Sequence, residues 1–249
     1  MGGHYWSKMR LAVLIALTPS VLPAADLKPE TAAAFDRYVT PIETVDLRDF
    51  LWLDQHPKEK SIVWLNQHVI TPRKRDRSDV PDGLIQDWLG TTFLSDVKLD
   101  KVRDVVLGFA DYKVRFKQQI SESKLEKREG DRFDASLRLH RRQLQSVVLD
   151  GNFSAQYTLL DPSHATVIFR STRLVPQGQD HGYLWRLNLY WRLEEADNGV
   201  YLEVELVSLS IQPGALHPGR LLNGFVQKFP REFTEGLIEG MQQAFPYHR

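Results

Sequence analysis

The sequence predicts an α+β fold in which a curved antiparallel sheet is wrapped around one long C-terminal helix. The clearest observation lies in residues 183–193, where every odd position is apolar and the even positions after Leu184 are mostly polar. This alternation is typical of a strand with one buried face and one face in water. A second such run at 200–211 follows a turn that ends at Gly199, and a helix with an apolar stripe comes next.

The earlier strands are predicted from the same period of two. A first strand covers 84–94, a helix with apolar residues at helical spacing covers 99–109, and a polar segment extends to about residue 123. Residues 124–129 offer one further strand. The remaining strands, separated by turn residues, are expected at 132–140, 144–159, 165–175, 183–193 and 200–211.

The last hairpin also predicts its own register. Aligning Trp191 with Val204 sets Arg192 opposite Glu203 on the outer face. Opposite charges across two strands form a favourable pair, so this alignment is the expected one.

Two helical segments are expected at the C-terminal end. Residues 221–229 form a short one, and Pro230 begins the terminal helix in the first-turn position that tolerates proline. The stripe of that helix consists of Phe229, Phe233, Leu237, Met241 and Ala244. Gly236 and Gly240 lie beside the stripe. They either permit close helix–sheet packing or leave room for a ligand, and the large apolar sheet face under one helix favours the second interpretation.

The first 25 residues have the layout of a secretory signal peptide. Lys8 and Arg10 precede the apolar run 11–17, and small residues precede Asp26. The run is too short to span a membrane, which takes about 20 apolar residues. We therefore expect a mature chain that starts near Asp26 and is periplasmic or secreted. The absence of cysteine from all 249 residues is compatible with an oxidising compartment.

Residues 26–80 are predicted to be a helical extension and linker in front of the main domain, 82–245. A helix is expected at 29–39, where proline stands in the first turn. The apolar clusters 50–53 and 62–65 are too few for an independent core, so this segment should pack on another part of the chain. The linker itself is the polar stretch 71–83.

Composition excludes several function classes. Thirty-two basic and 32 acidic side chains leave no net charge, so the chain lacks the excess of positive charge that nucleic-acid binding requires. The same balance suggests at most transient membrane contact. The histidines lack metal-ligand spacing, and no nucleotide or hydrolase motif is present, so no metal or cofactor is expected. The oligomeric state is not specified by the sequence.

Few residues are candidates for catalysis. His181, in a loop that enters a strand, is a potential base, although a turn histidine without function explains it better. Asp111 and Tyr112 are a potential acid–base pair, or a helix-ending aspartate beside a core tyrosine. Residues 140–142 (His-Arg-Arg) are expected to form a solvated hairpin tip.

The order of these elements and several short sequence motifs resemble the START-like (SRPBCC, Bet v 1-type) superfamily and an exported bacterial group within it. These motifs are 88–93 (WLGTTF), 109–112 (FADY), 130–133 (GDRF), 180–188 (DHGYLWRLN), 190–192 (YWR) and 229–232 (FPRE). The resemblance covers about residues 82–245. It implies a helix-grip fold whose cleft between sheet and C-terminal helix holds lipids, sterols or polyketides, and it supplies no catalytic motif.

The expected function is therefore non-enzymatic binding or carriage of an apolar small molecule. A cyclase or hydrolase that uses the same cavity, or an envelope interaction module with a solid core, are the alternatives. The residues expected to bind the ligand are Phe153, Phe169, Trp185, Leu187, Leu189, Trp191, Val204, Leu206, Phe233, Gly236, Leu237, Gly240 and Met241. For each of these residues, simple filling of a solid core is the competing interpretation.

Overall fold

The computed structural model describes residues 27–73, 75, 80–141, 144–177, 182–212 and 220–246. Its centre is one eight-stranded antiparallel sheet with the order β1-β2-β8-β7-β6-β5-β4-β3. The sheet is curved and not closed, because β1 and β3 are its edges. The strands are β1 (His68–Pro72), β2 (Gly83–Ser95), β3 (Ile120–Glu129), β4 (Arg132–Arg141), β5 (Leu144–Leu159), β6 (His164–Pro176), β7 (Leu184–Ala196) and β8 (Gly199–Ile211).

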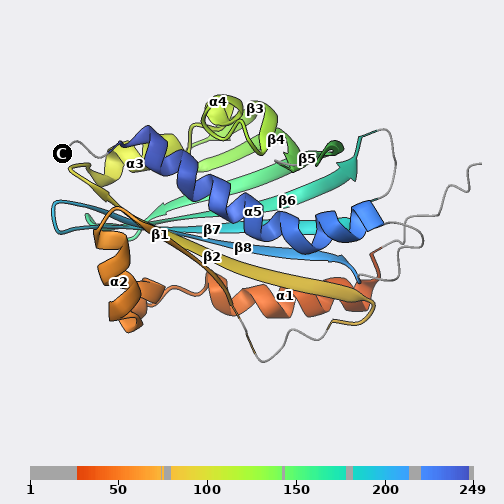
Figure 1. Cartoon of the computed structure of the whole chain (residues 1–249), viewed down its shortest axis with the longest axis horizontal. Coiled ribbons are helices and arrows are strands. Elements are labelled where there is room, and N and C mark those ends of the chain that lie inside the picture. Colours follow the sequence, from red (N-terminus) through yellow and green to blue (C-terminus); the bar gives the residue numbers. More distant parts are fainter. Residues whose placement is uncertain are drawn as a thin grey trace, which may run out of the picture.

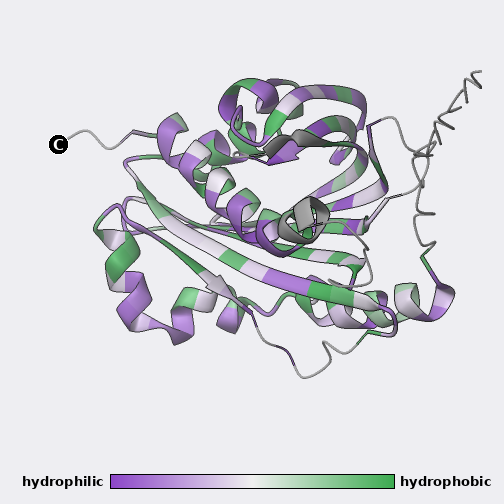
Figure 2. Ribbon diagram, turned by 45° about the vertical axis from the view of Figure 1, so that its right-hand side comes forward, coloured by the Kyte–Doolittle hydropathy of each residue, from purple (hydrophilic) through white to green (hydrophobic). Residues whose placement is uncertain are grey.

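Helices cover both faces of this sheet. The long helix α5 crosses one face, which we call the inner face, while α1 and α2 lie on the opposite, outer face (Figure 1). Figure 2 shows these helices banded in hydrophilic and hydrophobic colours, as expected of helices that bury one side. The helices are α1 (Pro29–Glu43), α2 (Pro57–Trp64), α3 (Leu99–Val106), α4 (Tyr112–Arg115) and α5 (Arg220–Ala244), with 3-10 turns η1 (Leu47–Asp49), η2 (Trp52–Gln55) and η3 (Phe109–Asp111).

The predicted α+β helix-grip architecture is confirmed, and so is the register of the last hairpin. Trp191 pairs with Val204, and Arg192 pairs with Glu203. The sequence did not predict β1, which pairs with β2 along residues 88–92. Strand β1 has five residues, mostly half-buried, so it lacks the alternation that identifies a longer strand.

The expectation of a wet outer face is wrong for the centre of the sheet. Every residue of β8 is buried, although its sequence alternates. Side chains of α1, such as Phe35 and Val39, pack against Val207 and Leu209 on the outer face of β8. The predicted extension therefore supplies a second apolar layer, and the sheet becomes the middle of three layers.

The two apolar clusters that follow α1 also find partners, as expected. Residues Phe50, Leu51, Leu53 and Val63 form one buried cluster with Phe93 and Tyr201, which lie on the outer face of β2 and β8. Trp64 is half exposed and stacks on Phe93 with ring centroids 4.8 Å apart. This end of the outer face is thus covered by η2 and α2.

The terminal helix differs from its prediction, because it is continuous from Arg220 to Ala244 and contains Pro230. Proline has no N–H, so the carbonyl of Val226, four residues earlier, loses its helical donor. The side-chain amide Nε2 of Gln86 on β2 donates to that carbonyl instead. A partner from the sheet therefore satisfies the acceptor that Pro230 leaves without a helical donor.

A buried ion pair fixes the same helix to the far side of the sheet. Arg141, at the end of β4, donates from Nε and Nη2 to the two carboxylate oxygens of Glu232 on α5, at 2.6 and 2.7 Å. Arg141 is 5% exposed. The expectation of a solvated tip is therefore wrong for Arg141, whereas Arg142 lies outside the described residues.

The two helical glycines lie against the segment that joins α4 to β3. A Cβ added at Gly236 would overlap the side chain of Gln119, and one added at Gly240 would overlap the ring of Phe116. Arg115 contributes a backbone carbonyl oxygen 3.1 Å from the latter position. In this structure the glycines therefore permit close packing, which is the first of the two interpretations of the sequence.

Replacing Gly240 by leucine is expected to lower the melting temperature. Overpacking of the Phe116 contact costs about 1–3 kcal/mol, which exceeds the gain of about 1 kcal/mol from removing a helical glycine. Thermal unfolding of Gly240→Leu and of the control Gln243→Leu, at an exposed position of α5, measures the difference. An unchanged or raised midpoint in Gly240→Leu would show that the glycine borders free volume.

Candidate functional site

The candidate ligand site is the apolar interface between the inner face and α5, which is filled by buried side chains and which we call the groove. Residues of β5, β6, β7, β8 and α5 meet there in one buried cluster. Ten of the residues predicted to bind ligand belong to it, and each is 2% exposed or less. They are Phe153, Phe169, Leu187, Leu189, Trp191, Val204, Leu206, Phe233, Leu237 and Met241.

The other three predicted residues are placed differently. Trp185 stands at a bulge between Leu184 and Arg186, where the pairing with β8 shifts. It is half-buried and packs against the apolar clusters of both faces, so it does not face the groove alone. Gly236 and Gly240 lie on the side of α5 that contacts Gln119 and Phe116, at the edge of the groove.

Aromatic rings fill much of the groove. Phe109 and Phe153 both stack on Phe169, with ring centroids 5.4 and 4.6 Å away. Phe225 and Phe229 of α5 stack at 4.6 Å. The sequence-based site omitted Phe109 and Phe225. Phe225 continues the stripe of Phe229 at a spacing of four, and the expected break at Pro230 hid that signal.

The candidate catalytic residues do not form a catalytic pair in this structure. The buried Tyr112 donates its hydroxyl to the carbonyl of Val106 at 2.5 Å, and burial raises its pKa. Asp111 is exposed and lies 3.9 Å from Arg115. His181 lies outside the described residues. Among the residues that are described, no three metal-ligating side chains gather at one point.

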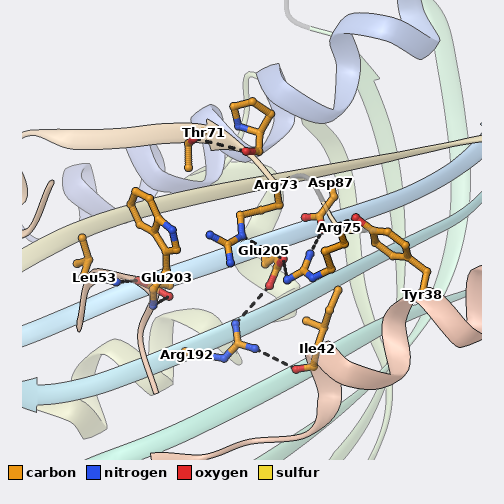
Figure 3. Close-up of polar contacts among 12 residues, drawn as sticks. Tyr38, Ile42, Leu53, Thr71, Arg73, Arg75, Asp87, Arg192, Glu203 and Glu205 are labelled. Carbon is orange, nitrogen blue, oxygen red and sulfur yellow. Dashed lines mark hydrogen bonds and ion pairs between the residues drawn. The ribbon is translucent and has the colours of Figure 1, made fainter. Parts of the chain in front are cut away.

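A buried cluster of charged residues lies on the outer face, beneath the N-terminal segment (Figure 3). It joins strands β2, β7 and β8 to the chain after β1. The cluster consists of Arg73, Arg75, Asp87, Arg192, Glu203 and Glu205. Sequence reasoning missed this feature. Its signal is the pair Glu203 and Glu205 in an otherwise mostly apolar run of β8.

Glu203 fastens the N-terminal segment directly to the sheet. Its carboxylate accepts the backbone N–H groups of Trp52 and Leu53 at 3.0 and 3.1 Å. The side chain is fully buried, and desolvation raises the pKa of Glu203 to about 7, although the two N–H groups and Arg192 oppose this rise. A carboxyl that titrates near neutrality therefore holds the start of η2.

The rest of the cluster is linked by arginines. Arg75 pairs with both Asp87 and Glu205. Arg192 lies 3.4 Å from Glu205 and donates to the backbone carbonyl of Ile42, at the end of α1, at 2.9 Å. The hydroxyl of Tyr38 donates to Asp87 at 2.9 Å. These contacts connect α1 with three strands, which is the role of a structural clamp.

Two shallow hollows on the outer face of β3, β4 and β5 have about 380 and 550 Å³ of free volume. Their polar linings are internally paired. Arg132 donates to Gln156 in the first, and Arg138 pairs with Glu122 and Asp150 in the second. Neither hollow has the apolar lining that is usual for a small-molecule site.

Comparison with protein-family models finds no match for the sequence, and comparison with curated proteins finds none either. Distant similarity exists to solved structures. A STAR-related lipid transfer protein from Xanthomonas axonopodis is 18% identical with a TM-score of 0.46, covering 70% of this chain and 99% of that one. Human STARD10 is 10% identical with a TM-score of 0.48, covering 81% and 80%. The Zhui aromatase/cyclase from a Streptomyces strain is 15% identical with a TM-score of 0.45, covering 64% and 88%.

The elements of this chain, described above, form a helix-grip fold, in which a long C-terminal helix crosses one face of a curved antiparallel sheet. Across the described ranges, no helix has the length and apolar character needed to cross a membrane.

The stability of the protein is expected to fall between pH 5 and pH 8, and Glu203→Gln is expected to reduce that fall. The pKa of Glu203 is raised in the folded state, so its stabilising effect is present below the unfolded pKa of about 4.3. That effect is lost as the pH rises through about 7. A shift of this size corresponds to about 3 kcal/mol in the free energy of unfolding.

Urea unfolding at pH 5 and pH 8 measures the effect, with the exposed Glu129 replaced by glutamine as the control. The neutral glutamine side chain in Glu203→Gln cannot ionise, so this variant should lose less stability than the parent protein over this range. An equal pH dependence in the parent protein, Glu203→Gln and Glu129→Gln would contradict the assignment.

Proposed function

We propose that this chain is an exported, non-enzymatic binder or carrier of an apolar small molecule, such as a lipid, a sterol or a polyketide. The ligand would lie between the inner face of the sheet and α5. The observation that carries the proposal is the composition of that interface, where strands β4 to β8 and helix α5 contribute to a single continuous apolar cluster. Ligand sites for apolar molecules are lined in this way.

The distribution of charge supports binding more than catalysis. The buried charged side chains among the described residues are Asp87, Arg141, Glu203 and Glu205. The three carboxylates lie on the outer face, in the cluster that holds the N-terminal segment. Arg141 is bound to Glu232. General acid–base chemistry needs an ionisable group within reach of the substrate, whereas a carrier needs only shape and apolar surface.

The aromatic filling of the groove means that a ligand has to displace side chains. Phe225 and Phe229 lie on the first half of α5, before Pro230, and this half is linked to the sheet by the bond from Gln86 to Val226. Entry of a ligand would require this half to move away from β2. A cyclase or hydrolase with the same cavity would turn over its ligand, and an interaction module with a solid core would bind none.

Ligand binding is expected to change the fluorescence of Trp191, which is buried in the groove. Titration of the purified protein with long-chain alcohols, fatty acids and sterols should alter the emission of the parent protein and of Trp64→Phe. Trp64 is the matched control because it stacks on Phe93 at the outer face. Trp191→Phe should lose most of the change.

Native mass spectrometry of the same samples tests occupancy independently. A mass increase that corresponds to one bound ligand supports a binder, and an increase that decays to a product of different mass supports an enzyme. If the protein binds no member of the panel in either measurement, the result contradicts both the binder and the enzyme.

Export is a separate part of the proposal, because residues 1–25 lie outside the described residues. N-terminal sequencing of protein from the periplasm or medium of a bacterial host should find a chain that starts near Asp26. Leu14→Arg, which places a charge in the apolar run 11–17, should keep the precursor uncleaved. Recovery of an intact Met1 on membrane-held parent protein would refute export.

A further inference from the structure

Two buried hydroxyl groups under α5 have no hydrogen-bond partner. They are Oη of Tyr183 and Oγ of Ser208, in residues that are 5% and 1% exposed. Buried polar side chains almost always have a partner, and an unpaired one costs the desolvation of the group. Such groups are therefore places where a partner that is not part of the chain would bind.

Both hydroxyls belong to the same part of the groove. Ser208 pairs across the sheet with Leu187 on one side and with Gln86 on the other. The amide of Gln86 reaches the carbonyl of Val226 on α5. The ring of Tyr183 packs edge-on against Phe225, the preceding residue of α5, with ring centroids 5.6 Å apart. The backbone carbonyl of Tyr183 accepts the N–H of Ile211, so Tyr183 and Ser208 are three residues apart along β8, on the side of the sheet that α5 covers.

Apart from the bonded side chains of Gln86 and Ser210, the surroundings of these hydroxyls are apolar. Tyr183, Leu184, Leu187, Phe225 and Phe229 belong to the same buried cluster. Burial raises the pKa of Tyr183, so its phenol stays protonated and can donate a hydrogen bond. The hydroxyl of Ser208 can donate or accept. The pair offers hydrogen bonds but no positive charge.

We propose that Tyr183 and Ser208 form a polar recognition point for a neutral oxygen, a hydroxyl or a carbonyl, at one end of an otherwise apolar ligand. This inference rests on the proposed function and adds the class of ligand. A carboxylate or phosphate is a poorer partner, because a buried anion requires a paired cation. The buried cation among the described residues, Arg141, is already bound to Glu232.

The test compares three probes with the same 16-carbon chain: 1-hexadecanol, hexadecanoate and hexadecane. Affinity is measured by Trp191 fluorescence and native mass spectrometry, with each probe delivered from cyclodextrin. The parent protein should bind the alcohol more tightly than the other two. Tyr183→Phe and Ser208→Ala should each weaken binding of the alcohol about tenfold, or about 1.4 kcal/mol, and leave the affinity for hexadecane unchanged.

The thermal stability of the ligand-free variants gives a second readout. Tyr183→Phe removes an unpaired hydroxyl, so its melting temperature should stay the same or rise. Tyr112→Phe is the matched control, because the hydroxyl of Tyr112 is bonded to Val106. It should lower the melting temperature and leave the preference for the alcohol intact.

The outcomes separate the two proposals. If the parent protein binds the probes but Tyr183→Phe and Ser208→Ala keep the preference for the alcohol, the recognition point is wrong and the binding function stands. If Tyr183→Phe weakens the alcohol and hexadecane equally, the residue acts by packing and the recognition point is again wrong. If no probe binds the parent protein, the proposed function fails as well.

Discussion

Strand β8 is buried on both faces, and the rest of the architecture depends on how each face is covered. Its inner side chains, such as Val204 and Leu206, pack in the apolar groove under α5. On its outer face the two carboxylates Glu203 and Glu205 are followed by Val207 and Leu209, which pack against α1. An antiparallel sheet usually leaves one face in water. Here the chain before β1 folds back over the outer face, so β8 is buried along its whole length.

The cost of burying two carboxylates on the outer face is met by specific partners. The raised pKa of Glu203 keeps part of this carboxyl group protonated, and the group accepts two backbone N–H groups. Glu205 lies within ion-pair distance of three arginines. Buried ion pairs often contribute little net stability relative to apolar packing, but loss of one partner is strongly destabilising. The cluster therefore restricts how the N-terminal segment packs on the sheet. The buried acids keep their partners only when Arg75, Arg192 and the start of η2 lie against them.

The strands of the domain were predictable from the sequence, and the layers were not. Alternation located β2 and β4 to β8 because each is longer than nine residues and most of its apolar residues recur at every second position. The same alternation gave the register that pairs Trp191 with Val204. It could not show that the outer residues are also buried, because Glu203, Arg192 and Asn188 have the polarity of a wet face. The outer residues are buried because α1 and η2 pack over them, and these contacts join parts of the chain that are far apart in sequence.

The candidate site, too, was predictable where it depends on periodicity and not where it depends on long-range contacts. Ten of its residues were located from strand and helix periodicity, because each lies on a face that the pattern defines. Phe225 was missed because Pro230 was taken as the start of a helix, and the bond from Gln86 to Val226, which allows the helix to continue, joins residues 140 positions apart. Trp185 was misjudged because a bulge shifts the strand by one residue.

The two faces of the sheet solve the problem of buried polar groups in different ways, and the contrast bears on function. On the outer face the buried carboxylates are bonded to named partners, and so are the groups that reach them, including Tyr38 to Asp87. On the inner face Tyr112 is bonded to Val106, yet Tyr183 and Ser208 are not bonded, and the outer face has one unpaired buried hydroxyl of its own, Oγ1 of Thr91. Replacing Tyr183 and Ser208 by phenylalanine and alanine should leave the stability of the ligand-free protein unchanged or raise it. An unpaired buried hydroxyl costs stability in the ligand-free protein, and a single neutral oxygen on a hydrophobic ligand would supply the missing partner in this apolar interface.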